Sequence, residues 1–287
     1  MPELPEVETT VRQVRPALVG QRITGVRVRW AGSVAGRSAG ALRRALTGKR
    51  IERVSRRGKF FVLDLGQAAH GMAHLVGHLR MSGRLWIERE GLPHDAHARV
   101  EIGLGRRQRL VFADVRKFGR LYFTQQPEEI FGHLGPEPLS SAFTPTWLAE
   151  ALGRRRRRIK PLLLDQAFIA GLGNIYTDES LFAARIHPLT LANTLGRAAV
   201  SRLTTSIRRV LSAAIRHEGS SFDSYYRTPE GRSGRYQDRL FVYGRGGHPC
   251  RRCGTPIVRI VVAQRGTHVC PRCQPTPRLR CRAQRRR

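Results

Sequence analysis

The chain has 287 residues, and its 52 Lys and Arg against 21 Asp and Glu give a net charge of +31 at pH 7. So large a positive charge repels itself unless a polyanion is close, so nucleic acid is the expected partner. No apolar run approaches the about 20 residues that a membrane span needs, and no secretory signal is visible. We therefore expect neither a membrane protein nor an exported one. The length of the chain is sufficient for two domains and a small module.

The first residues, Met1-Pro2-Glu3, suggest chemistry at the N-terminus. Removal of Met1 would expose the secondary amine of Pro2, and an α-amino group with a pKa near about 8 is partly neutral at physiological pH. An amine beside a carboxylate is the minimum needed for Schiff-base chemistry at a sugar carbon. Taken alone, these residues also fit a simpler interpretation, in which the prolines, Glu6 and Glu8 only open a helix.

Apolar residues at helical spacing predict a helix over residues 5–19, which Gly20 ends. The next hundred residues carry β-branched and aromatic residues between Gly-rich breaks, which is typical of strands in a β-sandwich or barrel-like domain. Residues 135–150 are expected to be a linker. The predicted strands are Arg22–Trp30, Glu52–Leu65, Ala73–Glu88, Ala98–Leu104, Leu110–Val115 and Arg120–Thr124.

The pattern is helical from about Trp147 to His217. Near Gly171 a glycine is expected to end one helix, and Asn174 to cap the next, which runs to Ile186. The backbone N–H groups at this helix start suit a phosphate, although a plain helical hairpin would look similar. A further helix is expected over Ala198–Arg216, followed by a loop over residues 218–238 that is either a mobile functional loop or disordered.

Four cysteines form two pairs, Cys250-x2-Cys253 and Cys270-x2-Cys273, with sixteen residues between the pairs. This spacing predicts a zinc ribbon in which four thiolates hold one Zn²⁺. Disulfides are the competing interpretation, but nothing suggests export. Cys281 lies outside the pattern and is expected to be a free thiol in a disordered tail, residues 274–287, whose six arginines would add non-specific DNA affinity.

Several longer motifs occur in a fixed order along the chain. With them the chain closely resembles the bacterial formamidopyrimidine-DNA glycosylases, DNA-repair enzymes of the helix–two-turn–helix superfamily, over about residues 1–273. The motifs are Pro2-Glu3-Leu4-Pro5-Glu6-Val7-Glu8, His78-Leu79-Arg80-Met81-Ser82-Gly83, Asp114-Val115-Arg116-Lys117-Phe118-Gly119, His133-Leu134-Gly135-Pro136-Glu137-Pro138-Leu139, Gly171-Leu172-Gly173-Asn174-Ile175-Tyr176, Glu179-Ser180-Leu181-Phe182, Val242-Tyr243-Gly244-Arg245 and Gln264-Arg265-Gly266-Thr267.

The resemblance implies an α+β fold with an N-terminal β-sandwich flanked by helices. We expect this catalytic domain over residues 1–134, the linker over 135–150, a helix–two-turn–helix DNA-binding domain over 151–241 and the zinc ribbon over 242–273. The zinc is then structural, because four thiolates leave no open position. The expected partner is damaged double-stranded DNA, bound by a monomer in the bacterial cytoplasm and associated with the nucleoid.

The resemblance also implies excision of oxidised purines, chiefly 8-oxoguanine opposite cytosine and formamidopyrimidines, after the damaged nucleotide leaves the stack. By analogy the amine of Pro2 attacks C1′, Glu3 acts as acid and base, and β- and δ-elimination follow. Lys59 matches a lysine with a catalytic proton-donor role, or it contacts a phosphate. Arg265 matches an arginine associated with phosphate contact and δ-elimination, where its permanent charge suits stabilisation of a leaving phosphate.

Two further groups of residues match DNA contacts of the family. Met81, Arg116 and Phe118 match the side chains that fill the gap left by the flipped base, although the two apolar ones would otherwise be assigned to a core. His97, Arg155, Lys160 and Asn174 match contacts with the DNA backbone, and His94 is a second candidate for the position of His97. Glu6 and Glu179 match acidic positions near the site, or they are structural.

Two other functions fit parts of the sequence. An endonuclease VIII-like glycosylase for oxidised pyrimidines shares Pro2, Glu3 and the ribbon, but Leu4 and the set of Met81, Arg116 and Phe118 favour purine lesions. By the resemblance, the loop over residues 220–236 occupies the place of the family's lesion-covering loop, and its Arg- and Tyr-rich sequence departs from the versions expected there. A non-catalytic zinc-ribbon DNA-binding protein would explain the charge but would not need a processed N-terminus.

Overall fold

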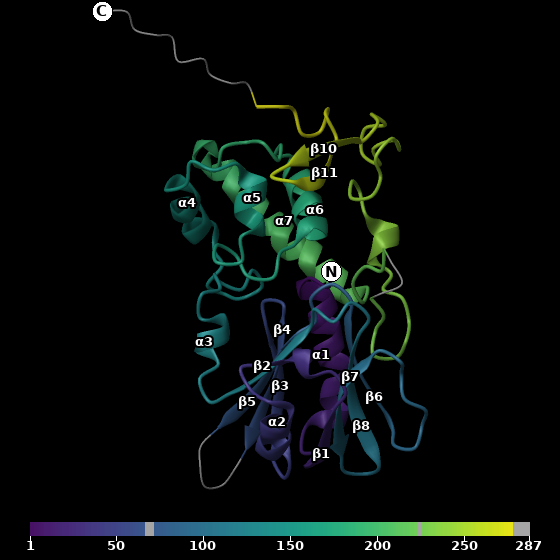
Figure 1. Cartoon of the computed structure of the whole chain (residues 1–287). Helices are drawn as coiled ribbons and strands as arrows, with labels where there is room; N and C mark the ends of the chain where they lie inside the picture. Colours follow the sequence, from purple (N-terminus) through teal and green to yellow (C-terminus); the bar gives the residue numbers. More distant parts are fainter. Residues whose placement is uncertain (67–71, 223–225, 278–287) are drawn as a thin grey trace, which may run out of the picture. The chain divides into compact units, whose positions relative to one another are not determined.

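The computed structural model describes residues 1–66, 72–222 and 226–277, and the chain divides into two compact units (Figure 1). Unit 1 contains residues 1–138, 169–172 and 211–239, and unit 2 contains residues 139–168, 173–210 and the segment from Leu240 onward. Each unit is thus assembled from separate stretches of the chain. Cys281 and most of the expected basic tail lie outside the described residues.

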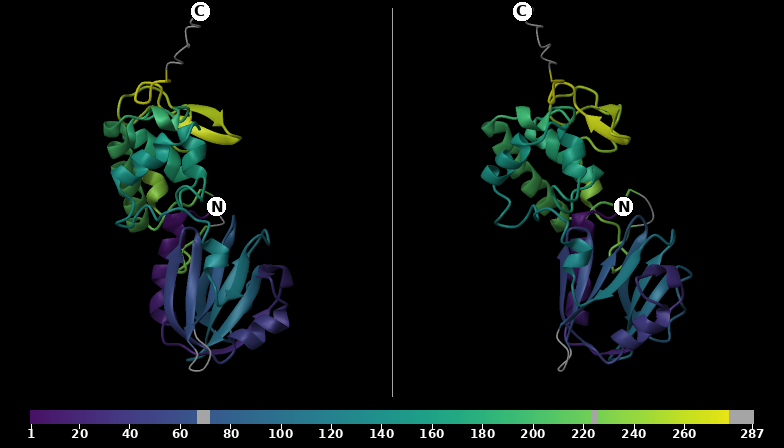
Figure 2. Two further views of the ribbon diagram at one scale, coloured as in Figure 1. Left: turned by 90° about the vertical axis from the view of Figure 1, so that its left-hand side faces the viewer. Right: turned by 60° about the vertical axis from the view of Figure 1, so that its left-hand side comes forward.

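Unit 1 consists of two sheets with helices against them (Figure 2). One sheet has the strand order β1-β7-β8-β6 and the other β2-β9-β5-β4-β3, in which only the short β2 pairs in parallel. The helices are α1 (Leu4–Leu18), α2 (Ala39–Leu46) and α3 (Glu128–Phe131). The strands are β1 (Ile23–Val28), β2 (Val34–Ala35), β3 (Arg50–Arg57), β4 (Phe60–Gly66), β5 (Ala73–His78), β6 (Gly83–Arg89), β7 (Ala98–Leu104), β8 (Gln108–Asp114) and β9 (Arg120–Thr124).

One hydrophobic core joins both sheets of unit 1 to α1 and α2. The apolar stripe of α1, formed by Val7, Val11, Val14 and Leu18, is at most 1% exposed. Burial of such a stripe is the main contribution to helix stability in a protein. The expected α+β architecture with an N-terminal β-sandwich is confirmed.

Three details of the predicted elements were wrong. The strands expected over residues 52–65 and 73–88 are each two strands, because left-handed residues turn the chain between them: Gly58 has φ +57° and Arg80 has φ +53°. A run of strand-forming residues does not reveal such a turn, because the turn depends on the backbone conformation of one or two residues within the run. Helix α2 was not predicted at all, although Ser38 caps it by accepting from the Ala41 N–H and so signals its start.

Unit 2 is helical apart from one β-hairpin. Its helices are α4 (Pro145–Gly153), α5 (Ile159–Leu164), α6 (Asn174–Ala184) and the first part of α7 (Arg197–Arg216). The hairpin consists of β10 (Val258–Val262) and β11 (Arg265–Val269) and pairs antiparallel. In the parts of the chain that the structure describes, no helix combines the length and the apolar character that a membrane crossing requires.

Candidate functional site

The start of α1 is held in place in unit 1 by backbone hydrogen bonds. Pro2 and Glu3 are buried, the Glu3 N–H donates to Glu6 Oε2 (2.8 Å), and the Leu4 N–H donates to the Gly171 carbonyl (3.1 Å). A side chain at Gly171, whose φ is +92°, would place its Cβ 2.6 Å from Leu4 Cδ1, so only glycine fits there. The amine of Pro2 becomes reactive only when Met1, which is exposed, is removed.

Lys59 lies in the turn between β3 and β4, where its side chain is buried. The carboxylate of Glu137 holds this turn by accepting from the Gly58 N–H (2.5 Å) and from Arg56 Nη2 (2.8 Å). Arg56 Nε also donates to Glu8 Oε2 (2.8 Å), which connects the turn to α1. Burial alone would lower the pKa of Arg56, but Glu137 and Glu8 raise it, so the network stays charged.

His78, which was not among the predicted site residues, lies close to Lys59. His78 ends β5, and its Nδ1 accepts from the Arg80 N–H (2.9 Å). Burial and the positive charges of Arg80 and Lys59 lower the pKa of His78 to about 3. The ring is therefore neutral at physiological pH and offers Nε2–H as a donor, which suits an anionic ligand. The sequence signal that could have identified His78 is its position at the end of a predicted strand, next to the turn that contains Arg80.

Glu6 links the helix start to the segment expected to cover the lesion. Its Oε1 accepts from the Ser220 N–H (2.8 Å), while its Oε2 holds Glu3. The described part of the 218–238 segment is folded: the Tyr226 hydroxyl, which is buried, donates to the Glu218 carbonyl (3.0 Å). Residues 223–225 of this expected loop lie outside the described residues.

Met81, Arg116 and Phe118 occupy two turns at one end of the four-stranded sheet. Met81 is 40% exposed and Phe118 is 47% exposed, which is unusual for such large apolar side chains. The Arg116 guanidinium lies 5.0 Å from the centroid of the Phe118 ring, so the pair is stacked before any DNA arrives. The three residues are thus exposed on neighbouring turns, as a group that enters a DNA gap must be.

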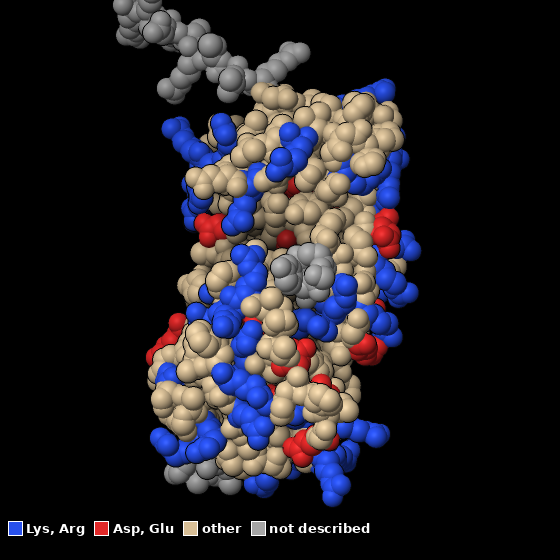
Figure 3. All heavy atoms as spheres, turned by 45° about the vertical axis from the view of Figure 1, so that its right-hand side comes forward, with Lys and Arg blue, Asp and Glu red and all other residues tan. Residues whose placement is uncertain are grey.

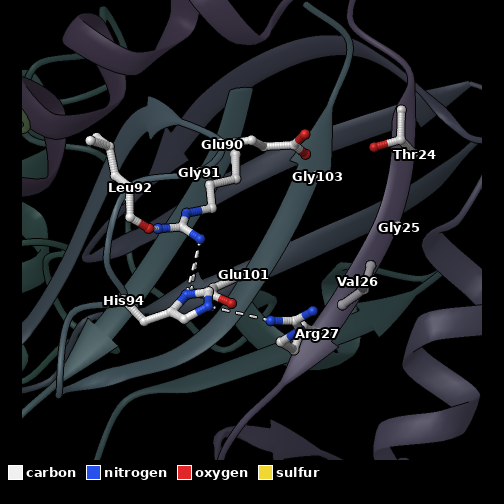
Figure 4. A pocket seen from close by; sticks show the side chains of 11 residues that line it. Thr24, Gly25, Val26, Arg27, Glu90, Gly91, Leu92, His94, Glu101 and Gly103 are labelled. Carbon is white, nitrogen blue, oxygen red and sulfur yellow. Dashed lines mark hydrogen bonds and ion pairs between the residues drawn. The ribbon is translucent and has the colours of Figure 1, made fainter. Parts of the chain in front are cut away.

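The structure distinguishes the two histidine candidates on the loop before β7. His94 Nδ1 lies 2.7 Å from Glu101 Oε1 and 3.0 Å from Arg109 Nη1, in a pocket of about 580 Å³ on the four-stranded sheet (Figure 4). His97 is exposed on the same loop, where its backbone N–H donates to Asp95 Oδ1 (2.6 Å). Both histidines are exposed, but the His94 ring is engaged by Glu101, Arg109 and Arg27, so His97 stays the predicted phosphate contact.

Lys160 differs from the expectation of a DNA contact. Its side chain is completely buried in unit 2, and its Nζ donates to Asp178 Oδ1 (2.6 Å), Thr267 Oγ1 (2.8 Å) and the Gly266 carbonyl (3.2 Å). Asp178 Oδ2 accepts from the His268 N–H (2.9 Å). We therefore correct the assignment: Lys160 holds the β10–β11 hairpin against α5 and α6.

Asn174 does not cap α6 as expected, because Gly173 occupies the cap position. Asn174 is the first residue of the helix, and its Nδ2 donates to the Gly266 carbonyl (2.9 Å). The helix start and the hairpin are thus joined through one carbonyl. Arg265 follows the hairpin turn and is exposed, as is Arg155 on the basic segment before α5.

The four cysteines gather at the base of the hairpin. Their Sγ atoms all lie within 4.8 Å of one another, and tetrahedral Zn–S bonds of about 2.3 Å would place them about 3.8 Å apart. The Arg252 N–H approaches Cys250 Sγ and the Cys273 N–H approaches Cys270 Sγ, both at 3.4 Å, as amides do toward a metal thiolate. The cluster fits a Zn²⁺ with four protein ligands and no open position.

The surface carries the charge that the composition requires. Lys and Arg side chains predominate over Asp and Glu on the face shown in Figure 3. Of the predicted site residues, unit 1 contains Pro2, Glu3, Lys59, Met81, His97, Arg116 and Phe118, and unit 2 contains Arg155, Lys160, Asn174, Arg265 and the four cysteines.

The buried ion pair of Lys160 and Asp178 gives a prediction about stability. Asp178→Asn leaves the Lys160 charge without its counter-ion, so the free energy of unfolding of unit 2 should fall by about 3–5 kcal/mol. The double variant Lys160→Met/Asp178→Leu removes both charges and should recover most of that loss. Urea denaturation of the full chain measures both, and a loss below about 1 kcal/mol in the single variant would contradict the structural role of the pair.

Comparisons with known proteins agree with this arrangement. Three family models match: the formamidopyrimidine-DNA glycosylase N-terminal domain over residues 1–121, its H2TH domain over residues 134–225, and a zinc finger found in FPG and IleRS over residues 247–276. The formamidopyrimidine-DNA glycosylase of Symbiobacterium thermophilum is 45% identical over 281 residues, which cover 96% of this chain and 90% of the relative. That of Chloroflexus aurantiacus is 44% identical over 266 residues, which cover 92% and 94%.

Solved structures of the Lactococcus lactis enzyme are similar along nearly the whole chain. A mutant in complex with a Fapy-dG containing DNA matches with a TM-score of 0.88 and 38% identity, covering 96% of this chain and all of that one. A complex with an abasic site containing DNA matches with a TM-score of 0.86 and 37% identity over the same shares. The chain belongs to the formamidopyrimidine-DNA glycosylase family.

Proposed function

We propose that this DNA glycosylase and AP lyase of base-excision repair removes oxidised purines from damaged double-stranded DNA, with the amine of Pro2 as its nucleophile. The observation that carries the proposal is the buried start of α1. There the Glu3 N–H donates to Glu6 and the Leu4 N–H donates to Gly171, and Gly171 also packs near Gly58 in the turn of Lys59. The residues that supply an amine, a carboxylate and a cation are thus all buried in unit 1, at the start of α1 and in a turn that packs near it.

The proposed reaction consists of base excision followed by two eliminations, and each step can be described by the bond that forms and the bond that breaks. The Pro2 amine bonds to C1′ while the C1′–N9 bond breaks and its electron pair leaves with the base. Glu3 exchanges protons with the sugar as its ring opens. In the resulting iminium the C2′ proton becomes acidic, so its loss expels the 3′ phosphate, and loss of the C4′ proton then expels the 5′ phosphate. Lys59, and Arg265 from the hairpin, supply positive charge where these phosphates leave.

The exposed group on unit 1 accounts for recognition. Met81 fills the space of the flipped nucleotide, Phe118 stacks at the opposite-strand step, and Arg116 donates to the unpaired opposite base. His97, Arg155 and Asn174 contact the DNA backbone, and His78, with its neutral ring beside Lys59, is added to them. The Fapy-dG complex of the Lactococcus lactis relative supports purine lesions as substrates.

A second lesion class has one observation in its favour. The wild-type Lactococcus lactis relative was also solved with an oxidized pyrimidine containing DNA, at 38% identity to this chain. Oxidised pyrimidines are therefore the alternative substrates, and cleavage of thymine glycol duplexes compared with 8-oxoguanine duplexes distinguishes them. We place the enzyme, as a monomer, in the bacterial cytoplasm on the nucleoid. Its one zinc is structural and takes no part in these steps.

Borohydride trapping tests the nucleophile directly. A duplex with 8-oxoguanine opposite cytosine should give a covalent adduct with the chain lacking Met1, and peptide mapping should place the adduct on Pro2, because reduction captures the Schiff base. Pro2→Gly keeps an N-terminal amine but should trap more slowly, since a primary amine replaces the secondary one. A processed protein that binds this duplex and gives no adduct would exclude the proposed chemistry.

Binding should depend strongly on salt. If about six to eight phosphates are neutralised, a plot of log K against log salt concentration should have a slope of roughly −5 to −7. The measurement is fluorescence anisotropy of a labelled duplex from 50 to about 200 mM salt. Arg155→Ala should reduce the slope by about 1. A slope near zero would be incompatible with backbone contacts as the source of affinity.

Chelation of the zinc should abolish activity by unfolding the ribbon, because four thiolates hold the metal and folding energy depends on it. Removal of the metal, verified by native mass spectrometry, is followed by assays of DNA binding and cleavage. Return of Zn²⁺ should restore both. Full activity in protein shown to be free of zinc would contradict the structural role of the metal.

A further inference from the structure

The turns that carry Met81 and the stacked Arg116–Phe118 pair are connected underneath by two buried side chains. Ser82 immediately precedes β6 and Asp114 ends β8, and these neighbouring strands pair with Gly83 opposite Asp114. Ser82 and Asp114 are 2% and 1% exposed. They lie below the surface from which the larger side chains project, so neither is positioned to contact DNA.

The Asp114 carboxylate bonds to both turns at once. Its Oδ1 accepts from the Ser82 hydroxyl (2.5 Å) and the Arg116 N–H (3.2 Å), and its Oδ2 accepts from the Gly119 N–H (2.6 Å). Ser82 Oγ in turn accepts from the Arg116 N–H (3.1 Å). The residue after Met81 therefore contacts the backbone of Arg116 directly, and one carboxylate fixes both ends of the Arg116–Phe118 turn.

Both turns contain a residue in a conformation that side chains disfavour. Arg80 has φ +53° and Lys117 has φ +60°, each next to a residue of the exposed group. A residue other than glycine persists in the left-handed region when surrounding bonds over-determine it. The Ser82–Asp114 bonds, together with the bond from the Arg80 N–H to His78, are the contacts that do so here. Loss of the bonds would release the turns to relax separately.

We propose that Ser82 and Asp114 are positioning residues that couple the two turns, so that Met81 and the Arg116–Phe118 pair enter the DNA as one unit. The inference rests on the proposed function of these three side chains as the group that fills the gap and reads the opposite base. Its consequence is specific. Discrimination between cytosine and adenine opposite the lesion depends on a hydroxyl and a carboxylate that never touch the DNA.

The test uses binding, so that it does not depend on the chemistry of Pro2. The full chain is titrated with duplexes that carry a stable abasic analogue opposite cytosine or adenine, and the ratio of the two Kd values is the discrimination. Ser82→Ala should reduce this ratio about tenfold, the effect of one lost hydrogen bond to a charged group. Asp114→Asn keeps the shape and should reduce it in the same direction.

A double-mutant cycle tests the coupling itself. Met81→Ala and Arg116→Ala should have non-additive effects on affinity for the cytosine duplex in the wild-type chain and additive effects in the Ser82→Ala chain. Ser33→Ala is the matched control, because Ser33 is also fully buried and its Oγ has no hydrogen-bond partner within the described part of the chain. That control should leave the ratio of Kd values unchanged.

The outcomes separate this inference from the proposed function. An unchanged ratio and an unchanged Met81–Arg116 coupling in Ser82→Ala would overturn the inference, even if the enzyme cleaves 8-oxoguanine normally. A reduced ratio with lost coupling supports it, even if borohydride trapping of Pro2 fails. A wild-type chain that does not distinguish cytosine from adenine would overturn both the reading role of Arg116 and the coupling built on it.

Discussion

The partly buried charge cluster of Glu8, Arg56 and Glu137 is the contact on which the candidate active site depends. Arg56 is enclosed between two carboxylates, and Glu137 also holds the Gly58 N–H, so α1, the β3–β4 turn and the segment at residue 137 are fixed together. Removal of one partner would leave a partly desolvated charge without compensation, which costs more than loss of an exposed pair would. The same charge cluster therefore fixes the two elements that carry Pro2 and Lys59.

Carboxylates also accept hydrogen bonds from backbone N–H groups at several other turns, although the chain has few acidic residues. Only 21 residues are Asp or Glu, yet several of them are buried, and their oxygens accept hydrogen bonds from backbone N–H groups of functional turns. Such bonds stabilise a carboxylate without using up the surface arginines, which stay available to DNA. The pairs of carboxylate and backbone N–H are Glu6 with Ser220, Glu137 with Gly58, Asp114 with Gly119, Asp178 with His268, and Glu179 with Val242.

The sequence was informative where residue type and spacing alone define a feature. The cysteine spacing predicts the ribbon and the apolar stripe predicts α1, because both depend on local periodicity. Lys160 could not be assigned correctly, since its counter-ion Asp178 lies on another helix and only the fold brings them together. Asn174 does not cap the helix, because α6 begins at Asn174 itself and Gly173 occupies the cap position, while the Asn174 amide donates to the distant Gly266 carbonyl.

The hairpin that carries Arg265 is held at both ends by different means. Its turn is strained, because Ala263 and Gln264 have φ +48° and +60° without being glycine. The cysteine cluster closes one end of the ribbon, while α6 provides two adjacent acids for the rest: Asp178 holds strand β11, and Glu179 accepts from three successive N–H groups at the ribbon entry. Burial raises the pKa of Glu179, although these N–H groups oppose the rise. The cysteine cluster and the helix thus hold separate parts of the ribbon, whose exposed turn carries the arginine.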